Sequence, residues 1–290
     1  MRPLVRAAAL LFSLPVCGFL FAQQPDSAPA SSQAGDTQSQ PRSHKSDDDA
    51  TLARAAKLYY STKSTGLTGF DCTVHPDWMT LIQSSRAQST VTESSEDVVL
   101  LKSVAISLRA RMNGSSALEW VQPSNASKPL DQASAEMLDE MHKGIEETLL
   151  GFMQFWTPFV DGSVVPPNST GIEIRRSSSG LILLIKQSEA VVMEVFSNEL
   201  VLKEFKVVTG GKMIDLKPSY DSTDDGLLVS RFVAQIGPAS TSAAEVKEMD
   251  VEIYYRTVGD FPIPSRLNVN VVGTGTFNFK LDNCRVNPSS

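Results

Sequence analysis

Residues 104–114, VAISLRARMNG, decide the fold class of this chain. Apolar side chains at Val104, Ile106 and Leu108 alternate with Ser and Arg, as in a strand with one buried and one exposed face. Asn113-Gly114 follows directly, and this dipeptide favours a tight turn between antiparallel strands. Residues 117–121 are therefore expected to return beside the first strand as the second arm of a hairpin.

The same period of two continues through the second half of the chain. Turn-forming pairs such as Ser197-Asn198 and Gly210-Gly211 separate short apolar runs. The expected strands here are residues 172–176, 181–186, 191–196, 200–208, 213–216, 227–236, 251–256, 263–272 and 276–286. None of the connections is long enough for a crossover helix, which excludes a parallel sheet. We predict a mainly β (α+β) fold, a curved antiparallel sheet or unclosed β-barrel of about 9–11 strands.

Two segments have helical spacing, and these are the two principal helices that we expect on or in the sheet. The first follows Ser46, a candidate cap, and ends at Gly66. The second covers residues 131–156 and is ended by Pro158. Its polar face is rich in Glu and Lys. Its broad apolar face consists of Met137, Met141, Ile145, Leu149, Phe152, Met153 and Trp156.

The first 46 residues do not belong to the predicted β domain. Arg2 and Arg6 precede an apolar run that is too short to span a bilayer, which is typical of a signal peptide over residues 1–22 cleaved after Ala22. A lipid anchor at Cys17 and an uncleaved anchor helix are the less favoured alternatives. Residues 23–46, rich in Ser, Gln and Pro, predict a disordered linker. Residues 47–290 then form a single β domain, and the protein is periplasmic or secreted.

Two cysteines, Cys72 and Cys284, remain once the signal peptide is removed. In an oxidising compartment such a pair most often forms a disulfide. Cys72 is in phase with the buried residues of its strand, whereas Cys284 is out of phase with Phe279 and Leu281. A bond therefore needs a bulge near Asn283 or a meeting at strand ends. Two separately buried thiols are the alternative.

Composition excludes several classes of partner. Without Arg2 and Arg6 the chain has 24 basic and 33 acidic residues, a net charge near −9, which argues against nucleic acid and anionic membrane surfaces. We expect no transmembrane helix in the mature chain, because no apolar run reaches the length of a bilayer. Nothing in the sequence indicates an oligomeric state.

The sequence predicts no catalytic residue, no metal site and no cofactor. Asp139, His142 and Glu146 share a helical face at metal-ligand spacing, but exposed helix charges explain them better than a metal does. His75 precedes a proline at a strand end, and a hydrolase that uses His75 or His142 is a distant third hypothesis. We therefore predict a protein that is not an enzyme.

The order of these elements resembles the periplasmic lipoprotein-localisation carriers and the wider outer-membrane lipoprotein-sorting superfamily. The shared layout is an amphipathic helix, a strand at residues 67–75, a long antiparallel meander with an inserted apolar helix, and the late segment GDFPIPSRL at residues 259–267. The resemblance covers most of residues 48–286. It implies an unclosed barrel whose helices cover an apolar cavity for acyl chains or another hydrophobic ligand.

Two functional hypotheses follow. In the first, the protein is a non-catalytic carrier or sensor with an apolar cavity for a lipid, a lipoprotein acyl chain or another hydrophobic ligand, and it takes part in handling cell-envelope lipids or lipoproteins. The ligand-binding residues would then be Met137, Met141, Ile145, Leu149, Phe152 and Trp156. In the second, the protein is an interaction or scaffold module whose core is filled and binds no small ligand.

Overall fold

The computed structural model describes residues 42–85, 96–121, 132–162, 164–187, 189–239, 246–273 and 275–288. The predicted signal peptide and the linker as far as residue 41 lie outside these ranges. The helices are α2 (Arg42–Ala56), α3 (Thr62–Thr65), α4 (Trp78–Ser85), α5 (Glu96–Ser103) and α6 (Gln132–Val160).

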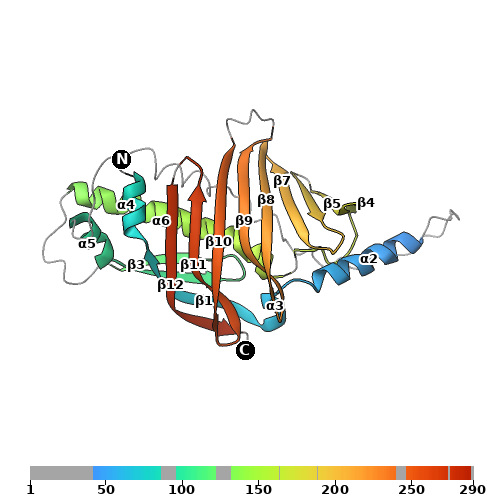
Figure 1. The fold of residues 1–290 in the computed structure, drawn as a ribbon, viewed down its shortest axis with the longest axis horizontal. Helices are drawn as coiled ribbons and strands as arrows, with labels where there is room; N and C mark the ends of the chain where they lie inside the picture. Colours follow the sequence, from blue (N-terminus) through green and yellow to red (C-terminus); the bar gives the residue numbers. More distant parts are fainter. Residues whose placement is uncertain are drawn as a thin grey trace, which may run out of the picture.

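One antiparallel sheet of twelve strands forms the body of the protein, in the order β3-β2-β1-β12-β11-β10-β9-β8-β7-β6-β5-β4. The sheet is curved and does not close, since β3 and β4 are its two edges (Figure 1). The strands are β1 (Leu67–Pro76), β2 (Ala105–Arg111), β3 (Ala117–Val121), β4 (Ile172–Ser177), β5 (Gly180–Lys186), β6 (Ala190–Phe196), β7 (Leu202–Thr209), β8 (Lys212–Thr223), β9 (Gly226–Pro238), β10 (Lys247–Val258), β11 (Phe261–Val271) and β12 (Gly275–Pro288). The predicted fold class, the hairpin after Asn113-Gly114 and the meander are confirmed.

The long helix α6 lies across one face of this sheet (Figure 1), which we call the inner face. Inner-face side chains form one continuous core with the helices; examples are Phe70 of β1, Phe232 of β9 and Phe279 of β12, each at most 1% exposed. The outer face carries most of the strand charges, as the period of two requires. Curvature therefore creates a trough, and α6 occupies it.

The first predicted helix is interrupted. Helix α2 begins at Arg42, before the expected cap, and ends at Ala56. Residues 58–60 then run beside the start of β9, where the Leu227 N–H donates to the Leu58 carbonyl and the Tyr60 N–H donates to the Leu227 carbonyl. Gly66 ends α3 in the left-handed region, with φ of 81°. Long-range pairing with β9 thus overrides the local helical pattern.

Two further differences concern the other helices. Pro158 does not end α6, which continues to Val160: Phe159 and Val160 pack into the core, and the Asp161 N–H closes the last turn on the Thr157 carbonyl at 2.8 Å. Helices α4 and α5 were not predicted. Asp77 is the signal for α4, because its carboxylate accepts hydrogen bonds from the backbone N–H and the hydroxyl of Thr80, as a helix cap does.

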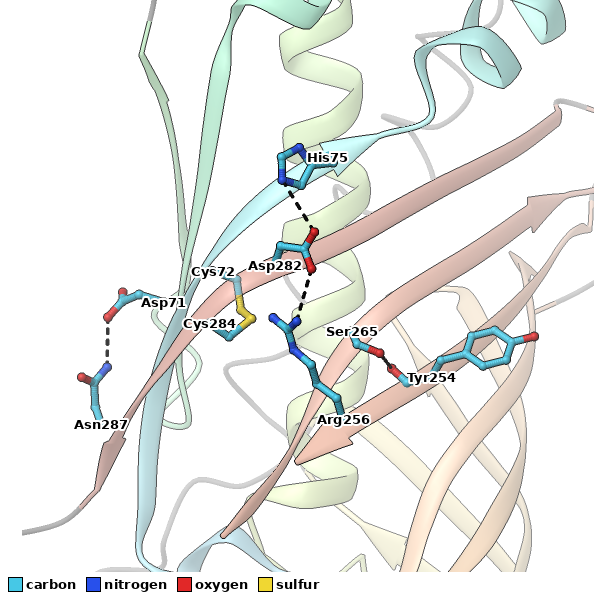
Figure 2. The surroundings of a disulfide bond; sticks show 9 residues. All are labelled: Asp71, Cys72, His75, Tyr254, Arg256, Ser265, Asp282, Cys284 and Asn287. Atoms are coloured by element: carbon cyan, nitrogen blue, oxygen red, sulfur yellow. Dashed lines mark hydrogen bonds and ion pairs between the residues drawn. A yellow bond between two sulfur atoms is a disulfide. The ribbon is translucent and has the colours of Figure 1, made fainter. Parts of the chain in front are cut away.

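The predicted disulfide is present and joins β1 to β12 (Figure 2). Asp71 pairs with Arg285 and Thr73 pairs with Asp282, so Cys72 faces two residues of β12 instead of one. The extra residue is Asn283, whose φ of 50° marks the bulge. The bulge shifts Cys284 toward the face of Cys72 and brings the two Cα atoms within 4.1 Å. The sequence expectation of a bulge at Asn283 is therefore met.

Candidate functional site

The apolar face of α6 packs into the trough of the sheet. Ile145, Leu149, Phe152 and Trp156 are 0–2% exposed, and Met141 is partly buried against the same core. Met137 lies in α6, but its side chain is outside the described part of the structure. The structure thus brings five of the six predicted ligand-binding side chains together in or against the common core.

Aromatic contacts of α6 reach from β7 to β1. The Phe159 ring lies 6.4 Å from the Phe205 ring of β7, and the Trp156 ring lies 6.0 Å from the Phe70 ring of β1. Between them, the Trp156 indole N–H donates to the Tyr255 hydroxyl at 2.8 Å. That hydroxyl donates in turn to the Val229 carbonyl at 2.6 Å. One helix therefore bridges the middle of the sheet.

The C-terminal end of α6 is fastened to α3 through Asp161. The Asp161 carbonyl accepts hydrogen bonds from the Lys63 N–H and the Ser61 hydroxyl, and its carboxylate accepts one from Thr62 at 3.3 Å. Lys63 adds an ion pair at 3.6 Å. The polar contacts of the helix at this end are therefore concentrated on one residue, whereas apolar packing holds its middle.

A carboxyl group is buried in the inner face at Glu194 of β6. The side chain is 4% exposed, and its Oε2 has no hydrogen-bond partner among the described residues. Leu183 of β5 and Phe205 of β7 lie directly opposite it in the sheet. An unpaired buried polar group costs about 1–3 kcal/mol, and Glu194 therefore calls for a functional or structural explanation.

Two tyrosines interact electrostatically with this carboxyl group. Tyr59 accepts a hydrogen bond from the Leu202 N–H at 2.7 Å and donates to the Leu200 carbonyl at 3.1 Å, which fixes the connection between β6 and β7. The Tyr220 ring packs edge to face on the Tyr59 ring at 5.4 Å. The Tyr220 hydroxyl is buried and, within the described ranges, unpaired. Two unsatisfied polar groups thus lie in the same part of the inner face.

Burial changes the acidity of both groups. It raises the pKa of Glu194 from 4.5 to about 8, because no group nearby offsets the loss of water around the carboxylate. Burial also raises the pKa of Tyr220, and the negative charges that Tyr59 and Glu194 can carry raise it further. At neutral pH both groups are therefore protonated, and each can donate a hydrogen bond.

The opposite face of α6 is open to solvent and polar. An open depression of about 530 Å³ runs along it, lined by Asp139, His142, Lys143, Glu146, Glu147, Leu150, Gly151 and Gln154. The His142 ring lies 4.1 Å from the Trp120 ring of β3 and its Nε2 lies 3.8 Å from the Glu146 carboxylate. No convergent set of three His, Cys, Asp or Glu side chains occurs in the described part of the chain.

His75, the other histidine of the hydrolase hypothesis, lies elsewhere. It is on β1 beside Asp282, with its Nε2 4.0 Å from that carboxylate, and Arg256 also bonds Asp282 (Figure 2). The structure therefore does not bring His75 and His142 together, since His142 stacks on Trp120 at the β3 edge.

Comparison with protein-family models, with curated proteins and with solved structures finds no match to this chain. Within the ranges that the structure describes, no helix is long and apolar enough to cross a bilayer. The disulfide is compatible with an exported protein.

Sequence reasoning missed Glu194, although its signal was present. In the predicted strand VVMEVF, Glu194 is in phase with Val192 and Phe196, which are 3% and 1% exposed. A carboxylate in register with buried residues contradicts the usual alternation, and such contradictions occur at functional sites.

Proposed function

We propose that this protein binds an apolar molecule of the lipid or acyl-chain class against the inner face of its sheet, and that α6 is a cover that shifts to admit it. The observation that carries the proposal is that one long amphipathic helix, α6, covers the middle of the trough. The side chains of this helix reach across the middle of the sheet, from Phe159 at β7 to Trp156 at β1. A shift of this one element would therefore give access to the middle of the inner face, while α4 and the residues around Tyr59 still cover other parts of the core.

The proposed activity is non-catalytic carriage or sensing of a hydrophobic ligand in an oxidising, extracytoplasmic compartment such as the periplasm. Three features support it together: the unclosed curved sheet, the amphipathic helix in its trough, and the similarity of layout to lipoprotein-localisation carriers. The ligand would contact the apolar face of α6 around Met141, Leu149 and Phe152, and the sheet residues opposite.

Uptake of diphenylhexatriene, a hydrocarbon that fluoresces only in apolar surroundings, tests the proposal. We expect saturable uptake by the folded protein. The uptake rate should reach a plateau at high probe concentration, because the shift of α6 then limits binding. Absence of saturable uptake by the wild-type protein would refute the proposal.

A pair of neighbouring tyrosines supplies a matched control for the role of α6. Tyr255→Phe removes the hydroxyl that accepts from Trp156 and should raise the plateau rate about fivefold, if the lost hydrogen bond stabilises the closed form by about 1 kcal/mol. Tyr254 is 40% exposed on the outer face, and among the described residues its hydroxyl bonds Glu252. Tyr254→Phe should therefore leave the rate unchanged. Equal rates for the two variants would show that α6 does not control entry.

One observation favours the second candidate, an interaction or scaffold module with a filled core. The apolar face of α6 is already packed, since Leu149 is 0% and Trp156 1% exposed. If the protein is a scaffold, Tyr255→Phe should lower its stability, and neither the variant nor the wild type should take up the probe. The same experiment therefore separates the two functions.

A further inference from the structure

We propose that Glu194 and Tyr220 are the polar contacts of the inner-face site, and that its ligand is an apolar molecule with one uncharged oxygen group, such as an acyl ester or a long-chain alcohol. This inference deepens the proposed function and rests on it. It adds a ligand chemistry that the apolar face of α6 does not define.

The geometry is a pair of unused hydrogen-bond groups inside an apolar wall. The Glu194 carboxyl lies between Leu183 and Phe205 on neighbouring strands, and Phe205 contacts Phe159 of α6. Both Glu194 Oε2 and the Tyr220 hydroxyl are buried without a partner among the described residues. Apolar pockets with a few convergent polar groups are the usual form of small-molecule sites.

The neighbouring groups determine which ligand chemistry fits. Tyr59 is the third polar group here, but its hydroxyl is already bonded to Leu200 and Leu202. Burial is the cause of the raised pKa of Glu194, and no cation lowers it. At neutral pH the site therefore offers two O–H donors and no positive charge.

An uncharged oxygen satisfies these donors best. An ester carbonyl or a hydroxyl can accept a hydrogen bond from either O–H group without bringing a charge into the core. A carboxylate or phosphate would lose its water without meeting a cation, which is unfavourable in an apolar interior. The site thus selects neutral over anionic lipids with the same chain.

The test uses three fluorescent probes: diphenylhexatriene, parinaric acid and the methyl ester of parinaric acid. At pH 7 the wild-type protein should bind the ester at least threefold more tightly than the acid, whose head is charged. Glu194→Leu and Tyr220→Phe should each weaken ester binding about three- to tenfold more than they change diphenylhexatriene binding. Glu194→Gln keeps an N–H donor and should retain ester binding within about twofold.

The hydrocarbon probe separates the failure of this inference from the failure of the proposed function. Retained diphenylhexatriene binding shows that a variant is folded with its site intact. If that probe binds but the ester binds no better than the acid, or Glu194→Leu and Tyr220→Phe leave ester binding unchanged, the inference is wrong and the proposed function stands. If the wild-type protein binds none of the probes, both are wrong.

Discussion

Replacing Glu194 by Gln should stabilise the folded protein at neutral pH. In the unfolded chain this carboxyl ionises above about pH 4.5, whereas burial raises its pKa in the folded chain to about 8. Between these values the folded state holds the proton that the unfolded state has lost, so the free energy of unfolding falls as pH rises. Glutamine has no such proton, and Glu194→Gln therefore avoids this loss.

The magnitude follows from the two pKa values. One pKa unit corresponds to about 1.4 kcal/mol, so the interval from 4.5 to pH 7 amounts to roughly 3 kcal/mol, and the whole shift to roughly 5 kcal/mol above pH 8. Below about pH 4 both states are protonated and the contribution vanishes. The advantage of Glu194→Gln over the wild type should thus grow with pH and level off above pH 8.

Urea unfolding without reductant at pH 4, 7 and 8.5 measures this effect. The quantity of interest is the stability difference between Glu194→Gln and the wild type at pH 7 minus the same difference at pH 4, because the subtraction removes any intrinsic preference for amide over acid. Glu140→Gln, at an exposed position of α6, is the control and should change stability by less than about 0.5 kcal/mol at every pH. A difference for Glu194→Gln that stays constant from pH 4 to 8.5 would show that the carboxyl is solvated or paired.

Three further predictions concern stability. Replacing Cys72 and Cys284 by Ala removes a crosslink over 212 residues and should lower the free energy of unfolding by up to about 5 kcal/mol in urea, and a loss below about 1 kcal/mol would contradict this. Leu149→Ala, at a fully buried position of α6, should cost about 2–5 kcal/mol by the same assay; a near-neutral result would mean that α6 is not packed on the sheet. Asp161→Ala leaves the buried Thr62 hydroxyl without its carboxylate acceptor and should cost about 1–3 kcal/mol, whereas Asp161→Asn keeps an acceptor and should cost less, an order that calorimetric melting can check.

Most of the sheet could be predicted from the sequence because its signals are local. Strands such as β2 show the period of two directly, and Asn113-Gly114 specifies the hairpin without knowledge of the rest of the chain. The phase mismatch of Cys284 predicted either a bulge near Asn283 or a meeting at strand ends, and the structure contains the bulge. Local pattern and final structure agree wherever neighbours in sequence are neighbours in the sheet.

Sequence-based prediction fails where contacts between distant segments determine the local structure. The pairing of β1 with β12, and that of Tyr59 with Leu227, join residues more than a hundred positions apart. The residues around Tyr59 do have helical spacing, but the pairing with Leu227 prevents a helix there. Glu194 is a different kind of failure: the pattern placed its strand correctly, yet an acidic residue in the buried phase was not treated as a signal.

The packing of α6 constrains how any ligand could enter. Burying Ile145, Leu149, Phe152 and Trp156 contributes on the order of 10 kcal/mol by the usual value per apolar side chain, which is comparable to the stability of a whole domain. A helix that lifted fully into water would therefore nearly unfold the protein. A carrier must instead exchange contacts gradually, so that the ligand covers the sheet while α6 covers the ligand. The Asp161 anchor suits such a movement, because it holds one end of α6 by polar bonds while the apolar middle shifts.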